Sequence, residues 1–375
     1  MPGSRDHSHP EPTEQAAVGR RRFLGIALGA AAGLAAHGCS TTASSTSGTS
    51  LPGPSSTRSS SGRSSPPPRP TTATAAAVAE TPADARPEAP AQPSIGPGEF
   101  DEPARVDQQA ERLAPPTPPG AYDREALYVA LYGFPGNSIL GSLGEQGVDG
   151  AVRRAADVAA GYEGFGRRVV PTFEILASVA SSSAGPDGDY SNEFTPTRFA
   201  PWLEAAAEND MHVVFDLQPG RSRFPDQARQ YEALWLVRHA SIALDPEWRV
   251  GPNQRPGGGR IGSVDGAEVN ETIDYLDDLI RRHRLPPKLC IVHQFADSMI
   301  TSKQLIRGTE NVQVLLQMDG FGSLTLKRGS WGRMVDDLPA GAFTGWKNFY
   351  DEDRPTPTPS QTMANDPQPR YVSYQ

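Results

Sequence analysis

Eight short runs rich in β-branched and aromatic residues recur along the chain from Leu127 onward, and amphipathic segments separate them. This alternation is typical of repeated βα units, in which the strands form a parallel sheet and the helices cover it. The runs span residues 127–133, 168–176, 212–219, 241–245, 288–295, 312–318, 341–346 and 370–374.

Eight strands within about 250 residues match the size of a (β/α)8 or TIM barrel. We therefore expect an α/β fold of this type for a domain spanning residues 120–375. The alternative is a doubly wound open sheet. A dinucleotide-binding sheet of that kind carries Gly-x-Gly-x-x-Gly after its first strand, and no such motif follows Gly133.

The strongest helical pattern lies between the fourth and fifth runs. Val269, Ile273 and Leu276 continue into Ile280 as one apolar stripe, and acidic residues occupy the opposite face. Ser263 and Asp265 are the candidates for its N-cap. Glycines after the sixth run and prolines after the seventh interrupt the pattern, so the helices expected there are weaker.

Residues 1–39 have the features of a bacterial export signal. Arg20 and Arg21 precede an uncharged run, residues 23–36, that makes about 21 Å of helix, whereas a bilayer core requires about 30 Å. The Arg20–Arg21 pair resembles the twin-arginine motif. Residues 34–39 resemble a lipobox, which implies lipidation of Cys39 and a lipoprotein on the outer face of the membrane or in the wall. Cleavage after Ala36, which would give a secreted protein, is the alternative.

Residues 40–119 form the predicted linker. Residues 40–99 contain no aromatic side chain and only Leu51, Val78 and Ile95 as large aliphatic residues, too little apolar surface to offset the entropy lost on folding. We therefore expect a disordered spacer rich in Pro, Ser, Thr and Ala. The net charge of −9 argues against a nucleic-acid partner, and 2 cysteines exclude a disulfide scaffold.

In TIM barrels the chemistry gathers at the carboxyl ends of the strands. Carboxylates inside apolar runs need a partner or a ligand, because burying an unpaired charge is costly. The polar and aromatic residues that close the runs are Glu174, Asp216, Gln218, Asp245, Glu247, Trp248, His293, Gln294, Gln317, Asp319, Trp346, Lys347 and Asn348.

The most informative of these segments is Leu244-Asp245-Pro246-Glu247-Trp248. The strand period of two points Asp245 and Glu247 to the same face. Repulsion and partial burial would then raise the pKa of one carboxyl group, giving the split between proton donor and ionised carboxylate that glycoside hydrolysis uses.

An Asp-x-Glu at the end of the fourth strand resembles the motif of lysozyme-like and chitinase-like barrel glycoside hydrolases. The resemblance implies that Glu247 is the acid and Asp245 its partner, with Asp216 or Glu174 as further base, nucleophile or orienting group. We expect the other strand-end residues to bind substrate. Trp248 and Trp346 would stack on sugar rings or, equally, plug the barrel.

The domain as a whole resembles an uncharacterised group of secreted lipoproteins from high-GC Gram-positive bacteria. The resemblance implies the fold and the location; no activity is assigned to that group. It rests on Pro171-Thr172-Phe173-Glu174, Asp216-Leu217-Gln218-Pro219-Gly220-Arg221, Leu244-Asp245-Pro246-Glu247-Trp248-Arg249, His293-Gln294-Phe295, Asp319-Gly320-Phe321-Gly322, Trp346-Lys347-Asn348-Phe349-Tyr350 and Val372-Ser373-Tyr374-Gln375.

Three functions remain open at this stage. The first is an envelope-anchored glycoside hydrolase without metal or cofactor, monomeric, acting on a polysaccharide or another small polar ligand. The second is a noncatalytic carbohydrate-binding or scaffold lipoprotein. The third is a metal-dependent hydrolase such as a phosphodiesterase, with ligands from Glu174, Asp216, Glu247, His293 and Asp319.

Overall fold

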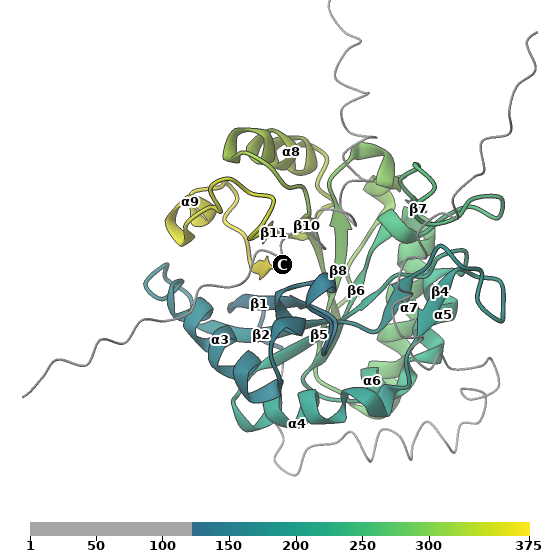
Figure 1. Cartoon of the computed structure of the whole chain (residues 1–375), viewed down its shortest axis with the longest axis horizontal. Helices are drawn as coiled ribbons and strands as arrows, with labels where there is room; N and C mark the ends of the chain where they lie inside the picture. Colours follow the sequence, from purple (N-terminus) through teal and green to yellow (C-terminus); the bar gives the residue numbers. More distant parts are fainter. Residues whose placement is uncertain (1–121) are drawn as a thin grey trace, which may run out of the picture. The chain divides into compact units, whose positions relative to one another are not determined.

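The computed structural model describes residues 122–375 (Figure 1). The predicted signal peptide, the predicted linker up to residue 119 and the lipidation site Cys39 lie outside the described residues. Within residues 122–375, no helix combines the length and the apolar character that crossing a bilayer requires.

Eight parallel strands close into a barrel, in the order β1-β12-β11-β10-β8-β6-β5-β2. The predicted TIM barrel is thereby confirmed, and the open sheet is wrong. Both ends of each barrel strand lie within three residues of the ends of the run that predicted it. The barrel strands are β1 Leu127–Gly133, β2 Val169–Leu176, β5 His212–Leu217, β6 Ala240–Leu244, β8 Lys288–Gln294, β10 Val312–Met318, β11 Phe343–Asn348 and β12 Tyr371–Tyr374.

The barrel closes because the last strand pairs with the first. Tyr128 lies opposite Tyr371 in the β1–β12 pair, and Leu127 lies opposite Val169 in the β1–β2 pair. Closure leaves the eight strands without an open edge. Two short pairs stand apart from the barrel: β3 Ser178–Ala180 with β4 Ser191–Glu193, and β7 Val264–Asp265 with β9 Ile300–Thr301.

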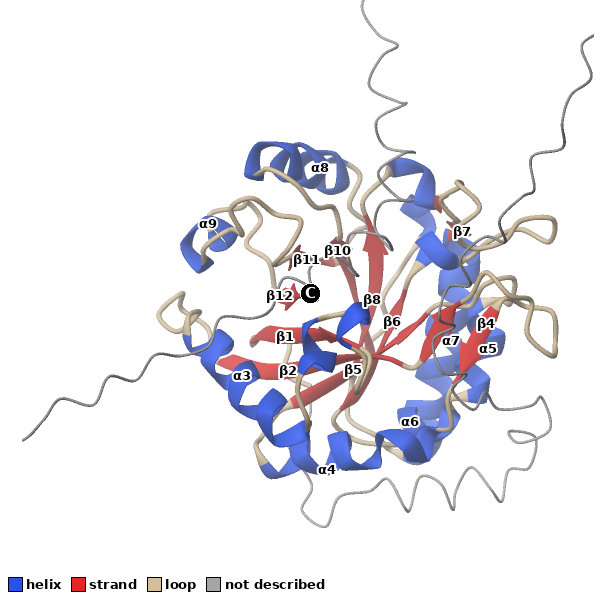
Figure 2. Ribbon diagram, viewed as in Figure 1, coloured by secondary structure: helices blue, strands red, loops and turns tan. Residues whose placement is uncertain are grey.

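Helices surround the strands (Figure 2). The predicted apolar stripe lies on α7, where Asp265 caps the helix by accepting from the backbone N–H of Ala267; Ser263 is not the cap. The helix after β10 forms over 13 residues despite its glycines, whereas only five residues form a helix after β11. The helices are α3 Val148–Ala160, α4 Ala200–Glu208, α5 Phe224–Gln230, α6 Glu232–Trp235, α7 Gly266–His283, α8 Leu324–Asp336 and α9 Pro359–Met363.

Alternate residues of each strand enter two separate cores. One cluster fills the barrel interior and includes Tyr128, Val214 and Ile291. The intervening residues pack outward against the helices; Cys290 is one of them, and burial raises the pKa of its thiol to about 12. The strand parity therefore decides which polar side chains enter the barrel and which face the helix layer.

Candidate active site

One layer of polar side chains closes the barrel interior at the carboxyl ends of alternate strands. Tyr132, Asp216, His293 and Lys347 come from β1, β5, β8 and β11, and each is at most 3% exposed. Four side chains from alternate strands are the usual content of one layer in a TIM barrel. Asp216, His293 and Lys347 can carry a charge, so neighbouring groups of opposite charge must stabilise them in this buried layer.

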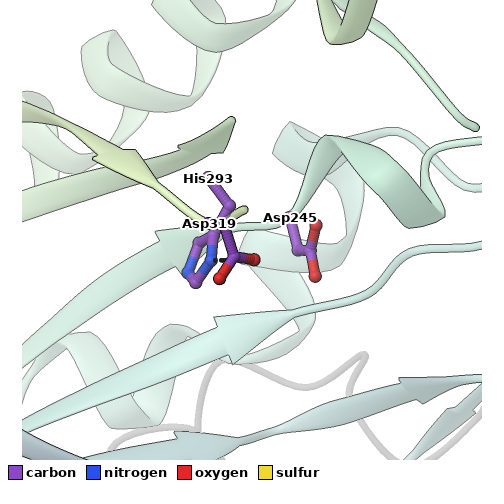
Figure 3. Close-up of side chains that lie close together, drawn as sticks. All are labelled: Asp245, His293 and Asp319. Carbon is purple, nitrogen blue, oxygen red and sulfur yellow. Dashed lines mark hydrogen bonds and ion pairs between the residues drawn. The ribbon is translucent and has the colours of Figure 1, made fainter. Parts of the chain in front are cut away.

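His293 lies between two carboxylates. Its Nε2 is 2.9 Å from Glu174 Oε1. Its Nδ1 is 3.0 Å from Asp319 Oδ2, a contact drawn in Figure 3. Burial favours the neutral ring, but the nearby carboxylates, Asp319 first, outweigh burial and raise the pKa of His293 well above its usual value. Both ring nitrogens therefore donate, and the ring is an imidazolium.

Asp319 also pairs with Lys347, whose Nζ lies 3.0 Å from Asp319 Oδ1. The same ammonium sits 3.5 Å from the centroid of the Tyr132 ring. Burial opposes ionisation of Asp319, but Lys347 and His293 outweigh it and lower the pKa of this carboxyl group. Asp319 is thus the ionised counter-charge of two buried cations.

Asp216, unlike Asp319, has no ion pair to either of its oxygens among the described residues. The Tyr132 hydroxyl donates to Asp216 Oδ2 at 2.9 Å, whereas Asp216 Oδ1 is buried without a hydrogen-bond partner among the described residues. Burial raises the pKa of Asp216 to about 6. At pH 7 this side chain is mostly an ionised carboxylate with a free oxygen inside the barrel.

Asp245 and Glu247 lie together, but the predicted reason is wrong. Strand β6 ends at Leu244, and the chain turns into the 3-10 helix Pro246–Trp248, so the strand period does not extend to Glu247. Asp245 instead caps this turn by accepting from the Glu247 N–H at 3.1 Å. The cap holds the Asp245 carboxylate against the Glu247 backbone, and the two carboxyl groups interact electrostatically.

Both carboxyl groups favour the protonated form. Burial, and then Asp216, raise the pKa of Asp245 to about 8. Burial, and then Asp245, raise the pKa of Glu247 to about 8. Asp245 is 3% exposed, whereas Glu247 and the adjacent Trp248 are partly exposed. Glu247 is therefore the acid that a ligand outside the barrel would meet first.

Three further predicted residues border the layer. Besides contacting His293, Glu174 accepts from the Tyr371 hydroxyl at 3.1 Å. Gln218 Nε2 lies 3.4 Å from the Tyr132 hydroxyl, and Gln317 donates to Ser373 at 2.6 Å. Tyr132 and Tyr371 were not predicted, because every residue of the first and last strands is buried and the sequence does not show which of them face the barrel interior.

Three predicted substrate-binding residues do not reach this site. Trp346 is fully buried and lies in the outer core, where its ring contacts Trp331 at 5.7 Å between centroids. Asn348 accepts from the Trp346 indole N–H, and Gln294 donates toward the Ala296 carbonyl. Each follows or precedes an inward-facing residue by one position and therefore points to the helix side.

Ligand atoms of Asp245, His293 and Asp319 lie within 4.8 Å of one another, close enough to consider a metal ion. The His293 imidazole argues against a metal ion at this position. Both His293 nitrogens already face carboxylate oxygens, so no ring lone pair is free for a metal unless one of these contacts breaks. The arrangement fits a charge-paired framework better than a metal centre.

The fold and this layer define an eight-stranded α/β-barrel with an acidic cluster at the carboxyl ends of its strands. No family model matches the sequence, and no curated protein matches it. Solved structures do match, among them a noncanonic maltogenic α-amylase, AmyB from Thermotoga neapolitana, at 10% identity and a TM-score of 0.32. The match covers 61% of this chain and 60% of the amylase chain. A likeness of this extent carries no information on activity.

Proposed function

We propose that the barrel is a glycoside hydrolase acting on a cell-wall or environmental polysaccharide. The observation that supports it is the split of carboxyl pKa values within one site: about 6 for Asp216 and about 8 for Glu247. At pH 7 the first group is ionised and the second protonated. Carboxyl groups whose environments separate their pKa values in this way can act as base and acid in one reaction.

In this mechanism Glu247 donates its proton to the glycosidic oxygen as the bond to the anomeric carbon breaks. The ionised Asp216 stabilises the positive charge that develops on the sugar. It then accepts a proton from the water molecule that attacks the anomeric carbon, so the sugar is released with a hydroxyl group. Burial, and then Asp245, raise the pKa of Glu247 and so keep the donor protonated. Glu174, His293, Asp319 and Lys347 form the paired charges that fix the layer, and the partly exposed Trp248 offers its ring to a sugar face.

This mechanism predicts a bell-shaped dependence of kcat/KM on pH. Activity should rise as pH rises through about 6, because Asp216 must ionise, and fall as pH passes about 8, because Glu247 must stay protonated. The test is the release of reducing ends from a panel of purified polysaccharides between pH 4 and 10. A rate that keeps rising up to pH 10 would contradict the assignment of Glu247 as the acid.

Noncatalytic carbohydrate binding is the second candidate. It is favoured by the burial of the cluster, since Asp216, Asp245 and Asp319 are 0–8% exposed. A binding protein would retain glycans through Trp248 and Glu247 at the surface without releasing reducing ends at any pH. Equilibrium binding measured beside turnover on the same polysaccharides separates the two candidates.

We further propose that the chain is exported and attached to the outer face of the membrane through a lipid on Cys39, on the support of the leader and lipobox-like sequences. The variant Cys39→Ser should move from the membrane fraction to the soluble or secreted fraction. Mass spectrometry of the wild-type N-terminus checks the modification. An unmodified N-terminus at His37 would show cleavage after Ala36 instead and contradict lipidation.

A further inference from the structure

A cavity of about 270 Å³ lies at the opposite end of the barrel from the acidic cluster. Its lining comes from the amino ends of strands: Arg167 lies two residues before β2, Phe343 begins β11 and Arg370 immediately precedes β12. The proposed hydrolase mechanism uses none of these residues. The volume is just below the roughly 300–1,000 Å³ of pockets that hold drug-sized molecules, so an occupant would be small.

Two guanidinium groups at this cavity share one carboxylate. Glu125 Oε2 lies 3.4 Å from Arg167 Nη1 and 3.5 Å from Arg370 Nη1. The Glu125 side chain is 80% exposed, whereas those of Arg167 and Arg370 are 26% and 18% exposed. One solvated negative charge at long distance therefore faces two partly buried positive charges, and the pair is incompletely compensated.

The arginines also carry unused hydrogen-bonding capacity. Arg167 Nε is buried and has no hydrogen-bond partner among residues 122–375. Arg370 is held in place: its guanidinium stacks 4.8 Å from the Phe343 ring centroid, and its Nη1 donates to the Arg124 carbonyl at 2.9 Å. Burial, and then the Arg167 charge, lower the pKa of Arg370. The cluster thus holds a buried N–H donor without a hydrogen-bond partner and two positive charges close together. A bound anion would stabilise both.

We propose that this cavity binds a small oxyanion, a phosphate or a carboxylate, between Arg167 and Arg370. Guanidinium groups suit such ligands because their planar donors match the oxygens of phosphate and carboxylate. Thr344 and Gln368 also line the cavity. Glu125 already pairs with both guanidinium groups, so its charge competes with an anion for them and weakens anion binding.

The test titrates the full-length protein with inorganic phosphate, sulfate and acetate at low ionic strength and follows binding by calorimetry. The variant Arg167→Gln should weaken binding by at least about tenfold, because a charge-assisted contact is lost. Glu125→Gln should strengthen it severalfold. The matched control is Arg168→Gln, because the Arg168 side chain is 58% exposed, pairs with Asp123 and does not line the cavity; its affinity should stay unchanged.

The discriminating result is weaker anion binding by Arg167→Gln together with stronger binding by Glu125→Gln. If this cluster had only a structural role, both substitutions would weaken binding. Thermal melting confirms that each variant folds. The proposal is overturned if neither wild type nor Glu125→Gln binds any of the three anions saturably. It is equally overturned if Arg168→Gln loses as much affinity as Arg167→Gln.

Discussion

The Glu247→Gln variant should cleave polysaccharide about a hundred- to ten-thousandfold more slowly than wild type, the usual loss when a general acid is removed. Gln keeps the shape of Glu and can still donate a hydrogen bond, but it cannot transfer a proton to the leaving oxygen. Glycan affinity should stay near the wild-type value, because the substitution changes neither the size nor the polarity of this partly exposed side chain greatly. Reducing-end assays and equilibrium binding on the same polysaccharide check both statements.

Two further variants test the role of Asp245 and control for the Glu-to-Gln change itself. Asp245→Asn should retain measurable activity but move the alkaline limb of the pH profile to lower pH, because Asp245 helps to raise the pKa of Glu247. Glu204→Gln is the matched control: the same chemical change on an exposed residue of α4, with no expected effect on rate. Equal rates for wild type and Glu247→Gln would remove Glu247 from the mechanism.

The sequence was sufficient to predict the barrel because every barrel strand is bounded by breaks in its apolar pattern. The eight runs are short, and turn residues or amphipathic segments separate them, so strand identity did not depend on tertiary contacts. The segment after β10 was harder to interpret. Its glycines weaken the local helix signal, and α8 forms through packing, since Lys327, Trp331 and Met334 are buried there.

The sequence does not predict which residues of each strand face the barrel interior and which face the helices. All seven residues of β8 are buried, so no alternation of polar and apolar residues indicates that His293 enters the barrel and Gln294 faces the helices. The same holds for β11, where Trp346, Lys347 and Asn348 are all buried. Only the closed barrel shows which residues face inward and which face the helices: Lys347 lies beside Asp319, and Trp346 lies beside Trp331.

Replacing Asp353 with Ala should reduce the free energy of unfolding by about 3–5 kcal/mol, because it leaves a buried lysine without its counter-charge. Asp353 and Lys327 form an ion pair in which both side chains are 0% exposed. Asp353 also accepts from the backbone N–H groups of Gly322 and Phe349, at 2.8 and 2.9 Å. The substitution therefore removes the charge partner of Lys327 and the acceptor of two backbone N–H groups together.

The measurement is thermal or denaturant unfolding of the full chain. For a domain of this size each kcal/mol corresponds to about 2–4 °C in Tm, so a fall of roughly 6–20 °C is expected. The matched control is Asp337→Ala. Asp337 also pairs with a buried lysine, Lys303, but its own side chain is 61% exposed and water can replace it. The control should lose much less stability than Asp353→Ala.

The double variant Lys327→Met/Asp353→Leu separates charge from packing. Removing both charges should recover much of the stability, because the penalty comes from the unpaired lysine. Some loss should remain, since Lys327 also donates to the Lys347 carbonyl at 2.8 Å and lies 5.0 Å from the Trp346 ring centroid. That bond fixes the backbone of the residue that pairs with Asp319, so cleavage should fall even in a well-folded double variant. A double variant as unstable as Asp353→Ala would show that packing, not charge, sets the loss.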